Sequence, residues 1–460
     1  MLKKKDVNML SGSIVKGLLT IALPVMAMNI LQSIYNIVDM TVLKIYDTDG
    51  GYSVGAVGTC GTLISLITGL VIGIASGTNV TVARHIGKGD TECVKKSVGT
   101  GISFSFIAGI VLLIIGVAFA KPFLKLINCP DRLLSGAILY FRLYFVGVPI
   151  LMIYTFCASI LRSTGDSQRP MVFTMISGAV KVLLNLLFVG VFKMQVLGVA
   201  LSTIFSWTIS LVLGLRALIK NETAVKIIKK YLHLYKDELK EMLFLGIPAG
   251  LQQALYSIAN VIIVATVNTY GEDATTGLSI ANQFDGILYQ IATAPALAVM
   301  PYVSQNVGAG NIKRASQSIL KGIMITVCLG ASFGALSAIF SVPLSSIMSD
   351  KPAVLEYSRQ KMVIVSSTYF ICGINEILGA AMRGLRKPIP ATVCTLVFMC
   401  GIRFIWVWFI YPLFTGGNAL TYLYLIWPIG WVLSIATLLC FYFPTVKKLK
   451  KSITINEMLK

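Results

Sequence analysis

Long apolar runs separated by short polar segments dominate the pattern of the 460-residue chain. Most runs are continuously apolar over about twenty residues, the length that an α-helix needs to cross about 30 Å of hydrocarbon. Strands of a membrane β-barrel would instead alternate over about ten residues. The pattern therefore predicts an all-α membrane protein of twelve transmembrane helices. Their expected ranges are 15–43, 53–81, 95–120, 136–160, 170–191, 195–219, 243–268, 275–304, 315–342, 357–382, 390–411 and 418–443.

The second half of this pattern repeats the first, with Pro24 matching Pro248 in the first helix of each half. Because six helices per half is an even number, both halves have the same orientation, and a pseudo-twofold axis along the membrane normal is expected. We therefore expect two six-helix lobes in a V-shaped arrangement with a central cleft, which suits an alternating-access carrier. The matched segments are 23–40 with 247–264, 83–90 with 304–311, and 161–166 with 382–387.

One long polar segment separates the halves and sets the expected domain boundaries. These are an N-lobe at 1–219, a basic cytoplasmic connector at 220–242, a C-lobe at 243–443 and a cytoplasmic tail at 444–460. The connector contains both helix-capping and basic residues, so it is expected to form one or two amphipathic helices.

Charge is scarce but asymmetric: 13% of residues are charged, 56% are hydrophobic, and the net charge is +20. A basic balance can indicate nucleic-acid binding, but no soluble basic domain is present to do it. Instead, 28 of the 39 Lys and Arg residues fall in one set of alternate loops, together with both termini. The positive-inside rule then predicts a multi-pass protein of the inner (cytoplasmic) membrane with both termini cytoplasmic.

The cysteines and histidines are not spaced like the residues of a metal site or an enzyme active site. The nine cysteines form no CxxC pair and mostly lie in apolar runs, so they are interpreted as small core residues. His85 and His233 lie far apart in predicted cytoplasmic segments, and no Walker A motif is present. We therefore expect no cofactor, no metal site, no ATP use and no enzymatic activity.

Five ionisable residues lie well inside apolar runs, where each charge costs about 2.5–3.5 kcal/mol even on a mild insertion scale. They should face the lobe interiors or the cleft and find partners. Lys181 and Arg403 occupy equivalent places in the two halves. We expect Asp39 to pair with Lys181, and Arg403 with Glu376, Asp285 or both. Two roles remain open for them: coupling to a proton or ion, or static ion pairs that hold helices in register.

Polar residues of the repeated first helices are candidates to line a substrate route. They are Gln32, Tyr35, Asn36, Tyr256, Asn260 and, from the next helix, Gln283. The alternative is ordinary hydrogen bonding between helices, worth about 0.6 kcal/mol per contact. Pro24 should kink its helix and is a candidate hinge, although such kinks can also be static.

Three motifs in one order resemble the multidrug and toxic compound extrusion (MATE) family over nearly the whole chain. They are Pro24 with Asn36–Asp39, Gly87–Asp90, and Leu161–Asp166. The resemblance implies a cation-driven exporter of organic, often cationic and amphipathic, compounds.

The resemblance also implies a coupling site. In many members an Asp of helix one joins an Asn and an Asp of helix five. Asp39 matches the first, whereas Lys181 and Asn185 stand at the other two positions. Some members also have a Glu in helix seven. The equivalent position in this chain lies near Tyr256, so that carboxylate is missing here. Since the second carboxylate is missing, H⁺ is favoured over Na⁺ as the coupling ion.

Competing functions remain. The first alternative is a lipid-linked oligosaccharide flippase of the same superfamily, to which the cations Lys181 and Arg403 give some weight. A channel or scaffold fits the two-lobed repeat less well. The expected partners are a small-molecule substrate and the lipid bilayer, with no nucleic acid, and the protein is expected to be a monomer.

Overall fold

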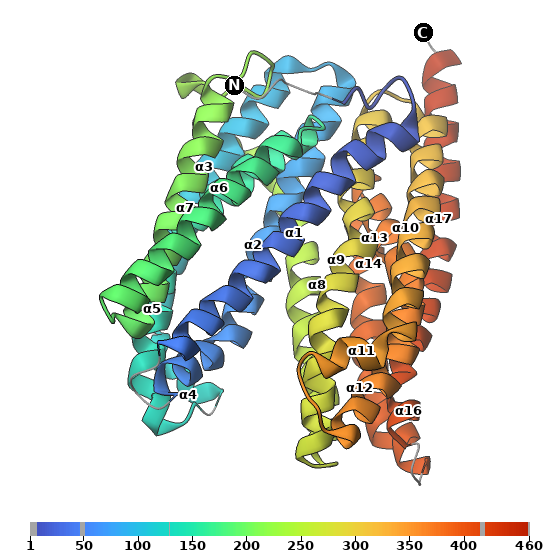
Figure 1. The fold of residues 1–460 in the computed structure, drawn as a ribbon. Coiled ribbons are helices and arrows are strands. Elements are labelled where there is room, and N and C mark those ends of the chain that lie inside the picture. Colours follow the sequence, from blue (N-terminus) through green and yellow to red (C-terminus); the bar gives the residue numbers. More distant parts are fainter. Residues whose placement is uncertain (1–6, 47–50, 128, 415–418, 459–460) are drawn as a thin grey trace. The chain divides into compact units, whose positions relative to one another are not determined.

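The computed structural model describes residues 7–46, 51–127, 129–414 and 419–458, and all regular structure in these ranges is helical (Figure 1). Twelve helical segments there are long and apolar enough to cross a membrane. Each overlaps one predicted range, so the all-α, twelve-helix prediction is confirmed. The ends differ because most helices continue several residues into the polar segments.

The first half contains α1 (Ile14–Ile45), α2 (Tyr52–Lys88), α3 (Thr91–Ala118), α4 (Ala120–Leu126), α5 (Asp131–Ser163), α6 (Gln168–Asn185), the π-helical η1 (Leu186–Val191) and α7 (Gln195–Ile219). The second half contains α8 (Lys236–Asn268), α9 (Glu272–Gly308), α10 (Ile312–Ile339), α11 (Ser341–Ser346), α12 (Pro352–Val365), the 3₁₀ turn η3 (Ser366–Thr368) and α13 (Tyr369–Gly384). It continues with α14 (Pro388–Cys394), the π-helical η4 (Thr395–Gly401), α15 (Ile402–Ile405), the π-helical η5 (Trp406–Ile410), η6 (Tyr411–Leu413), α16 (Ala419–Tyr424) and α17 (Ile426–Met458). Helix α17 thus runs through most of the segment that was expected to be a tail.

The repeat is visible in equivalent turns of the two halves. After α2 the chain reverses at Gly89 (φ 73°), and Asp90 caps α3 by accepting a hydrogen bond from Cys93 N at 3.0 Å. After α9 it reverses at Gly310 (φ 78°), and Asn311 caps α10 in the same way. A left-handed glycine followed by an Asx cap stops one helix and starts the next.

One helix lies at the centre of the packing in each half. Helix α5 packs against α2, α3 and α7, and its counterpart α13 packs against α9, α10 and α17. The core of the first half includes a cluster of aromatic side chains on α5, with Phe141 and Phe145 almost fully buried. The same set of helix neighbours therefore recurs within each half.

The chain folds into two compact units whose borders cut through two helices. The first unit is built mainly from Ala27–Gly246, and the second from Asn8–Met26 with Ile247 onward. In the second unit Arg314 donates to the Met9 carbonyl at 2.9 Å, which ties the start of the chain to α10. The borders therefore differ from those expected, because the start of α1 packs with the second half.

The expectation of amphipathic helices in the connector is wrong. Between α7 and α8 the connector forms one short 3₁₀ turn, η2 (Lys229–Tyr231). Its backbone bonds to α3 instead: Thr100 Oγ1 donates to the His233 carbonyl at 3.3 Å and accepts from Tyr235 N at 3.2 Å. Gly99 leaves room for this close approach, since a side chain there would overlap the Tyr231 carbonyl.

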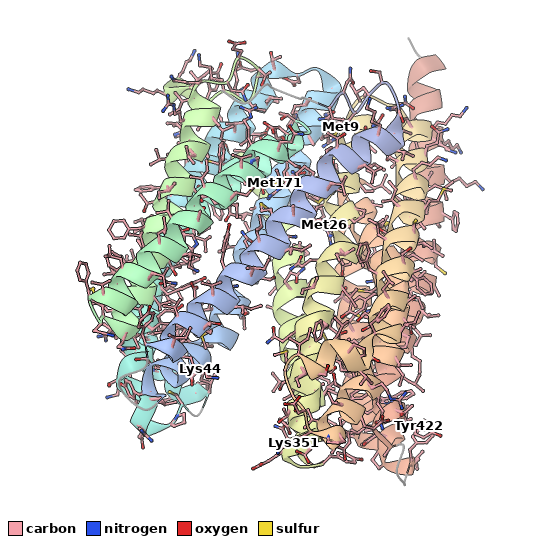
Figure 2. All side chains as sticks on the ribbon, in the orientation of Figure 1. Met9, Met26, Lys44, Met171, Lys351 and Tyr422 are labelled. Atoms are coloured by element: carbon pink, nitrogen blue, oxygen red, sulfur yellow. The ribbon has the colours of Figure 1, made fainter. Side chains whose placement is uncertain are left out.

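Large apolar side chains are exposed along many helices, as expected for surfaces that face lipid. Examples are Ile114 on α3, Ile339 on α10 and Phe409 in η5. Lys351 and Tyr422 both lie near one end of the second unit, apart from each other (Figure 2).

Candidate functional site

The first unit contains the predicted ion pair between helices one and five. Lys181 Nζ lies 2.5 Å from Asp39 Oδ2, and both side chains are about nine-tenths buried. Asn185 Nδ2 donates to Asp39 Oδ1, also at 2.5 Å. Lys181 and Asn185 are four residues apart and therefore share one face of α6. Both carboxylate oxygens of Asp39 thus have a donor.

A residue that the sequence analysis missed completes this network. Ser202 on α7 donates to Asn185 Oδ1, and both side chains are fully buried. The Ser202 hydroxyl therefore orients the amide so that its NH₂ group faces Asp39. Sequence alone gives no signal for Ser202, because many small polar residues occur in these helices.

The polar residues of α1 lie apart from this network. Gln32 and Asn36 are exposed, whereas Tyr35 is partly buried and donates to the Met175 carbonyl at 3.4 Å. The Tyr35 ring occupies the space beside Gly178, where a side chain on residue 178 would overlap it. Helix α1 passes from the second unit to the first between Met26 and Ala27, directly after Pro24.

The second unit contradicts the expected pairing of Asp285 and Arg403. Asp285 pairs instead with Lys361 of α12, Oδ2 to Nζ at 2.7 Å, and the Lys361 and Asp285 side chains are 2% and 8% exposed. Ser366 Oγ donates to Asp285 Oδ1 at 3.1 Å, and Lys361 also donates to Asn282. Lys361 was missed at the level of sequence, although this residue lies inside the predicted helix 357–382. Helix α12 starts at Pro352, so Lys361 lies more than two turns into the helix and reaches Asp285 of α9.

Arg403 has no carboxylate partner within the described residues. Its Nη1 donates to Asn260 Oδ1 at 2.6 Å, and its guanidinium carbon lies 5.0 Å from the Tyr256 ring centre and 5.4 Å from that of Trp427. The side chain is 1% exposed, and Nε and Nη2 make no hydrogen bond to described residues. Arg403 lies on α15, a single turn between two π-helical segments, and its guanidinium contacts Asn260 and Tyr256 of α8 and Trp427 of α17.

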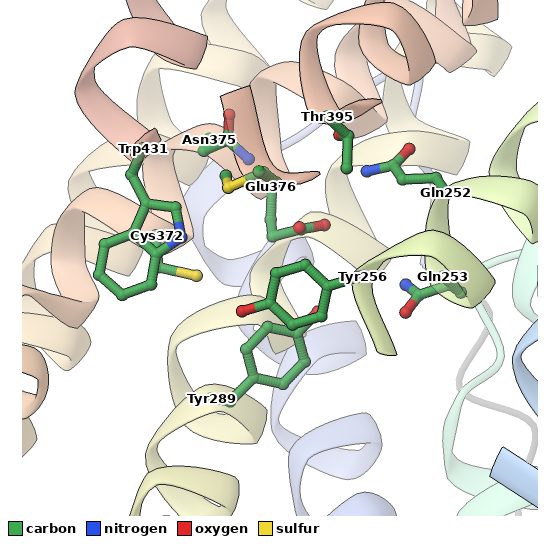
Figure 3. Close-up of a pocket in the computed structure, with 10 residues that line it drawn as sticks. Gln252, Gln253, Tyr256, Tyr289, Cys372, Asn375, Glu376, Thr395 and Trp431 are labelled. Carbon is green, nitrogen blue, oxygen red and sulfur yellow. The ribbon is translucent and has the colours of Figure 1, made fainter. Parts of the chain in front are cut away.

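Glu376 lines a pocket within the second unit, and the pairing with Arg403 expected for it is also wrong (Figure 3). No basic group lies within ion-pair distance of Glu376 among the described residues. Figure 3 shows the Glu376 carboxylate beside the Tyr256 and Tyr289 rings. The lining residues are Gln252, Gln253, Tyr256, Tyr289, Cys372, Asn375, Glu376, Thr395, Met399 and Trp431.

Other predicted residues lie outside this pocket. Gln283 is exposed on α9, and Asn260 is partly buried beside Arg403. The pocket residues Gln252 and Gln253 come one turn before Tyr256 on α8, so the sequence repeat that selected Tyr256 also pointed to their neighbourhood. One group of potential metal ligands, His85, Asp90 and Cys93, occurs in the described part of the first unit.

The comparison with family models gives two matches of one family. The MatE family model matches residues 24–187 and again 248–409, more than two thirds of the chain. The two stretches begin at Pro24 and Pro248, the prolines that define the sequence repeat. A model for a protein of unknown function, DUF624, matches the short stretch 182–258.

Curated relatives and solved structures agree with this match. A probable multidrug resistance protein of Bacillus subtilis, YoeA, is 28% identical over 83% of this chain and 83% of the relative. A FAD transporter of Shewanella oneidensis is 25% identical over 73% of this chain and 75% of the relative. The structure of an outward-facing multidrug resistance MATE family transporter of the MOP superfamily superposes with a TM-score of 0.88, at 20% identity, over 98% of this chain and 100% of that chain. At that identity, the likeness to the solved structure concerns the fold.

Proposed function

Because the chain belongs to the MatE family of membrane transporters, we propose that it exports small organic, cationic and amphipathic compounds by proton-coupled antiport. The multidrug resistance protein of Bacillus subtilis supports export of varied compounds. The matched repeat supports alternating access, since duplicated helix bundles are the usual basis of that mechanism.

The observation that supports proton coupling is that both carboxylate oxygens of Asp39 already accept a hydrogen bond. Sodium binding needs several oxygen ligands around one ion, but both Asp39 oxygens already accept donors at 2.5 Å. Lys181 contributes a positive charge where a second carboxylate would be needed. A proton requires only one oxygen, and its binding to Asp39 would release Lys181 from the pair. We therefore assign proton exchange to Asp39 and its Lys181 partner, with Asn185 orienting the carboxylate.

We assign the Glu376 pocket to the cationic part of a substrate, which would enter as the lining side chains move apart, because the space between them is only about the size of a water molecule. The Glu376 carboxylate would attract an organic cation, since it forms no ion pair within the described residues and Arg383 acts on it only from beyond ion-pair distance. The Tyr256 and Tyr289 rings would add cation–π contacts. A bound substrate cation would thus form the ion pair that Glu376 does not make with Arg383. This role places coupling in the first unit and substrate recognition in the second.

Reconstituted vesicles test the proposal with imposed gradients. Purified protein in liposomes should transport a fluorescent organic cation when a pH gradient is imposed without sodium, and a sodium gradient alone should have no effect. Asp39→Asn should remove pH-driven transport while the protein still inserts. Glu376→Gln should weaken transport of the cation more than that of a neutral compound. Full transport by Asp39→Asn would exclude Asp39 from coupling.

A second function is favoured by Arg403, a buried cation that pairs with no carboxylate in the part of the chain that the structure describes. An anionic substrate such as a lipid-linked oligosaccharide would suit it, and one relative is a FAD transporter. A vesicle assay with a fluorescent lipid-linked oligosaccharide separates the two functions. If the protein moves that lipid but transports no dye, it should be assigned as a flippase rather than as an exporter.

The proposal also covers location and assembly. We place the protein in the cytoplasmic membrane with both termini in the cytoplasm, as a monomer that binds no nucleic acid. The asymmetric distribution of Lys and Arg among alternate loops supports this orientation. A cysteine introduced by Lys313→Cys, at an exposed position in the first turn of α10, should resist an impermeant thiol reagent in whole cells, and its modification there would contradict this orientation.

A further inference from the structure

We propose that His85, Asp90 and Cys93 form a binding site for a zinc-type divalent metal ion at the junction of α2 and α3. One ligand atom from each residue lies within 4.8 Å of the other two. The site lies wholly in the first unit and shares no residue with the Asp39 network. It does not depend on the proposed transport function.

The backbone turn between α2 and α3 brings the three residues together. Gly89 adopts a left-handed conformation (φ 73°) and reverses the chain directly after α2. His85 lies in the last turn of α2, and Cys93 in the first turn of α3. Asp90 lies between them and is fixed by the hydrogen bond from Cys93 N. The ligand spacing is thus set by the same turn that joins the helices.

The burial and hydrogen bonding of His85 provide independent evidence for a ligand. The residue is 7% exposed, and its Nδ1 makes no hydrogen bond to a described residue, whereas Nε2 lies 3.2 Å from Glu238 Oε2. Buried polar groups in folded proteins nearly always have a partner, so a buried ring nitrogen without one needs an explanation. A metal ion coordinated by Nδ1 would supply the missing partner.

Glu238 of α8 positions this ring. Its Oε2 lies 3.2 Å from His85 Nε2 and accepts a hydrogen bond from Ser97 Oγ at 2.5 Å. Metal-binding histidines commonly direct their second nitrogen to a carboxylate, which fixes the ring and raises its basicity. Glu238 is therefore a positioning residue, and Ser97 holds it in place.

The donor set selects the class of metal. Imidazole and thiolate favour Zn²⁺ and similar transition metals, whereas Mg²⁺ and Ca²⁺ prefer oxygen ligands alone. Zinc bonds of about 2.0–2.3 Å require the three ligand atoms to move closer together. Small rotations of the three side chains would bring the ligand atoms, which lie within 4.8 Å of one another, to these distances. Three protein ligands leave the fourth position of the tetrahedron to water.

Cobalt and zinc titrations of the full chain in detergent test the site. The parent protein carries Cys328→Ser and Cys440→Ser, which remove the two exposed thiols, and a chelator strips bound metal first. We expect one Co²⁺ per chain with thiolate-to-cobalt absorption, and displacement of the cobalt by Zn²⁺. Cys93→Ser should abolish this absorption, and His85→Asn should weaken zinc binding at least about tenfold.

Two variants separate metal binding from folding. Asp90→Asn keeps the helix cap, because Asn accepts the same backbone hydrogen bond, but it should weaken zinc binding. Glu238→Gln should weaken it about 10- to 100-fold while the thiolate absorption stays. The matched control His233→Asn, which changes the other histidine, should leave zinc binding unchanged. Equal zinc affinity of the parent and His85→Asn, or thiolate absorption that persists in Cys93→Ser, would overturn the proposal.

Discussion

In the first unit the buried cation Lys181 faces the carboxylate of Asp39, whereas its repeat counterpart Arg403 in the second unit faces the amide of Asn260. Glu376, the acid expected beside Arg403, lies instead in a pocket that Tyr256 also lines, and the Arg403 guanidinium lies over the Tyr256 ring. Duplication has therefore kept the cation in both halves but not its counter-charge. A contact pair neutralises itself, while separated charges each remain available to another partner.

The largest expected effect comes from Lys181→Met in the first unit. The substitution leaves the Asp39 carboxylate buried without its cation, which costs about 3–5 kcal/mol of stability. Adding Asp39→Asn should restore most of the loss, because the stranded charge disappears. Thermal unfolding in detergent measures both changes. A double variant no more stable than Lys181→Met would show that Lys181 stabilises the unit by packing.

Arg403→Met in the second unit should cost less. It strands no carboxylate, and it removes one charged hydrogen bond to Asn260 together with the contacts to the Tyr256 and Trp427 rings, about 1–3 kcal/mol in total. The same unfolding assay ranks it directly against Lys181→Met. A larger loss of stability for Arg403→Met than for Lys181→Met would contradict the idea that the cation with a carboxylate partner matters more for stability.

The smallest contrast concerns the equivalent helix caps Asp90 and Asn311. The backbone hydrogen bond from Cys93 lowers the pKa of Asp90 below its ordinary value, whereas Asn311 does not titrate. A lowered folded-state pKa stabilises the protein above the ordinary Asp pKa of about 3.9, and this stabilisation is lost as the pH falls through the folded value. Asp90 is a surface group, so we expect roughly a few tenths of a kcal/mol.

Exchanging these two caps measures the effect. Asp90→Asn should unfold like the parent near neutral pH and lose less stability between about pH 5 and pH 2. Asn311→Asp should gain acid sensitivity. Thermal unfolding is followed over this pH range with a chelator present, so that metal binding at Asp90 does not contribute. Identical acid profiles for all three proteins would assign the acid sensitivity to other groups.

The sequence predicted those features that depend on local pattern. Apolar runs set the number of helices, and the cost of a buried charge correctly indicated that Asp39 and Lys181 would meet. The sequence could not predict the partners of Arg403 and Asp285, because several helices place polar groups in the same core. The connector was mispredicted because its backbone bonds to Thr100 of α3, a tertiary contact that helix propensity does not register.

The π-helical segments have a consequence for how the two halves diverge in length. An i→i+5 hydrogen bond encloses one residue more than the bond of an α-helix, so such a turn can absorb a single-residue insertion without displacing the helix ends. The fifth helix of the first half contains one such segment, after Lys181, and its counterpart contains two, around Arg403. Insertions and deletions could thus accumulate inside these helices during evolution while the cation kept its depth in the bilayer.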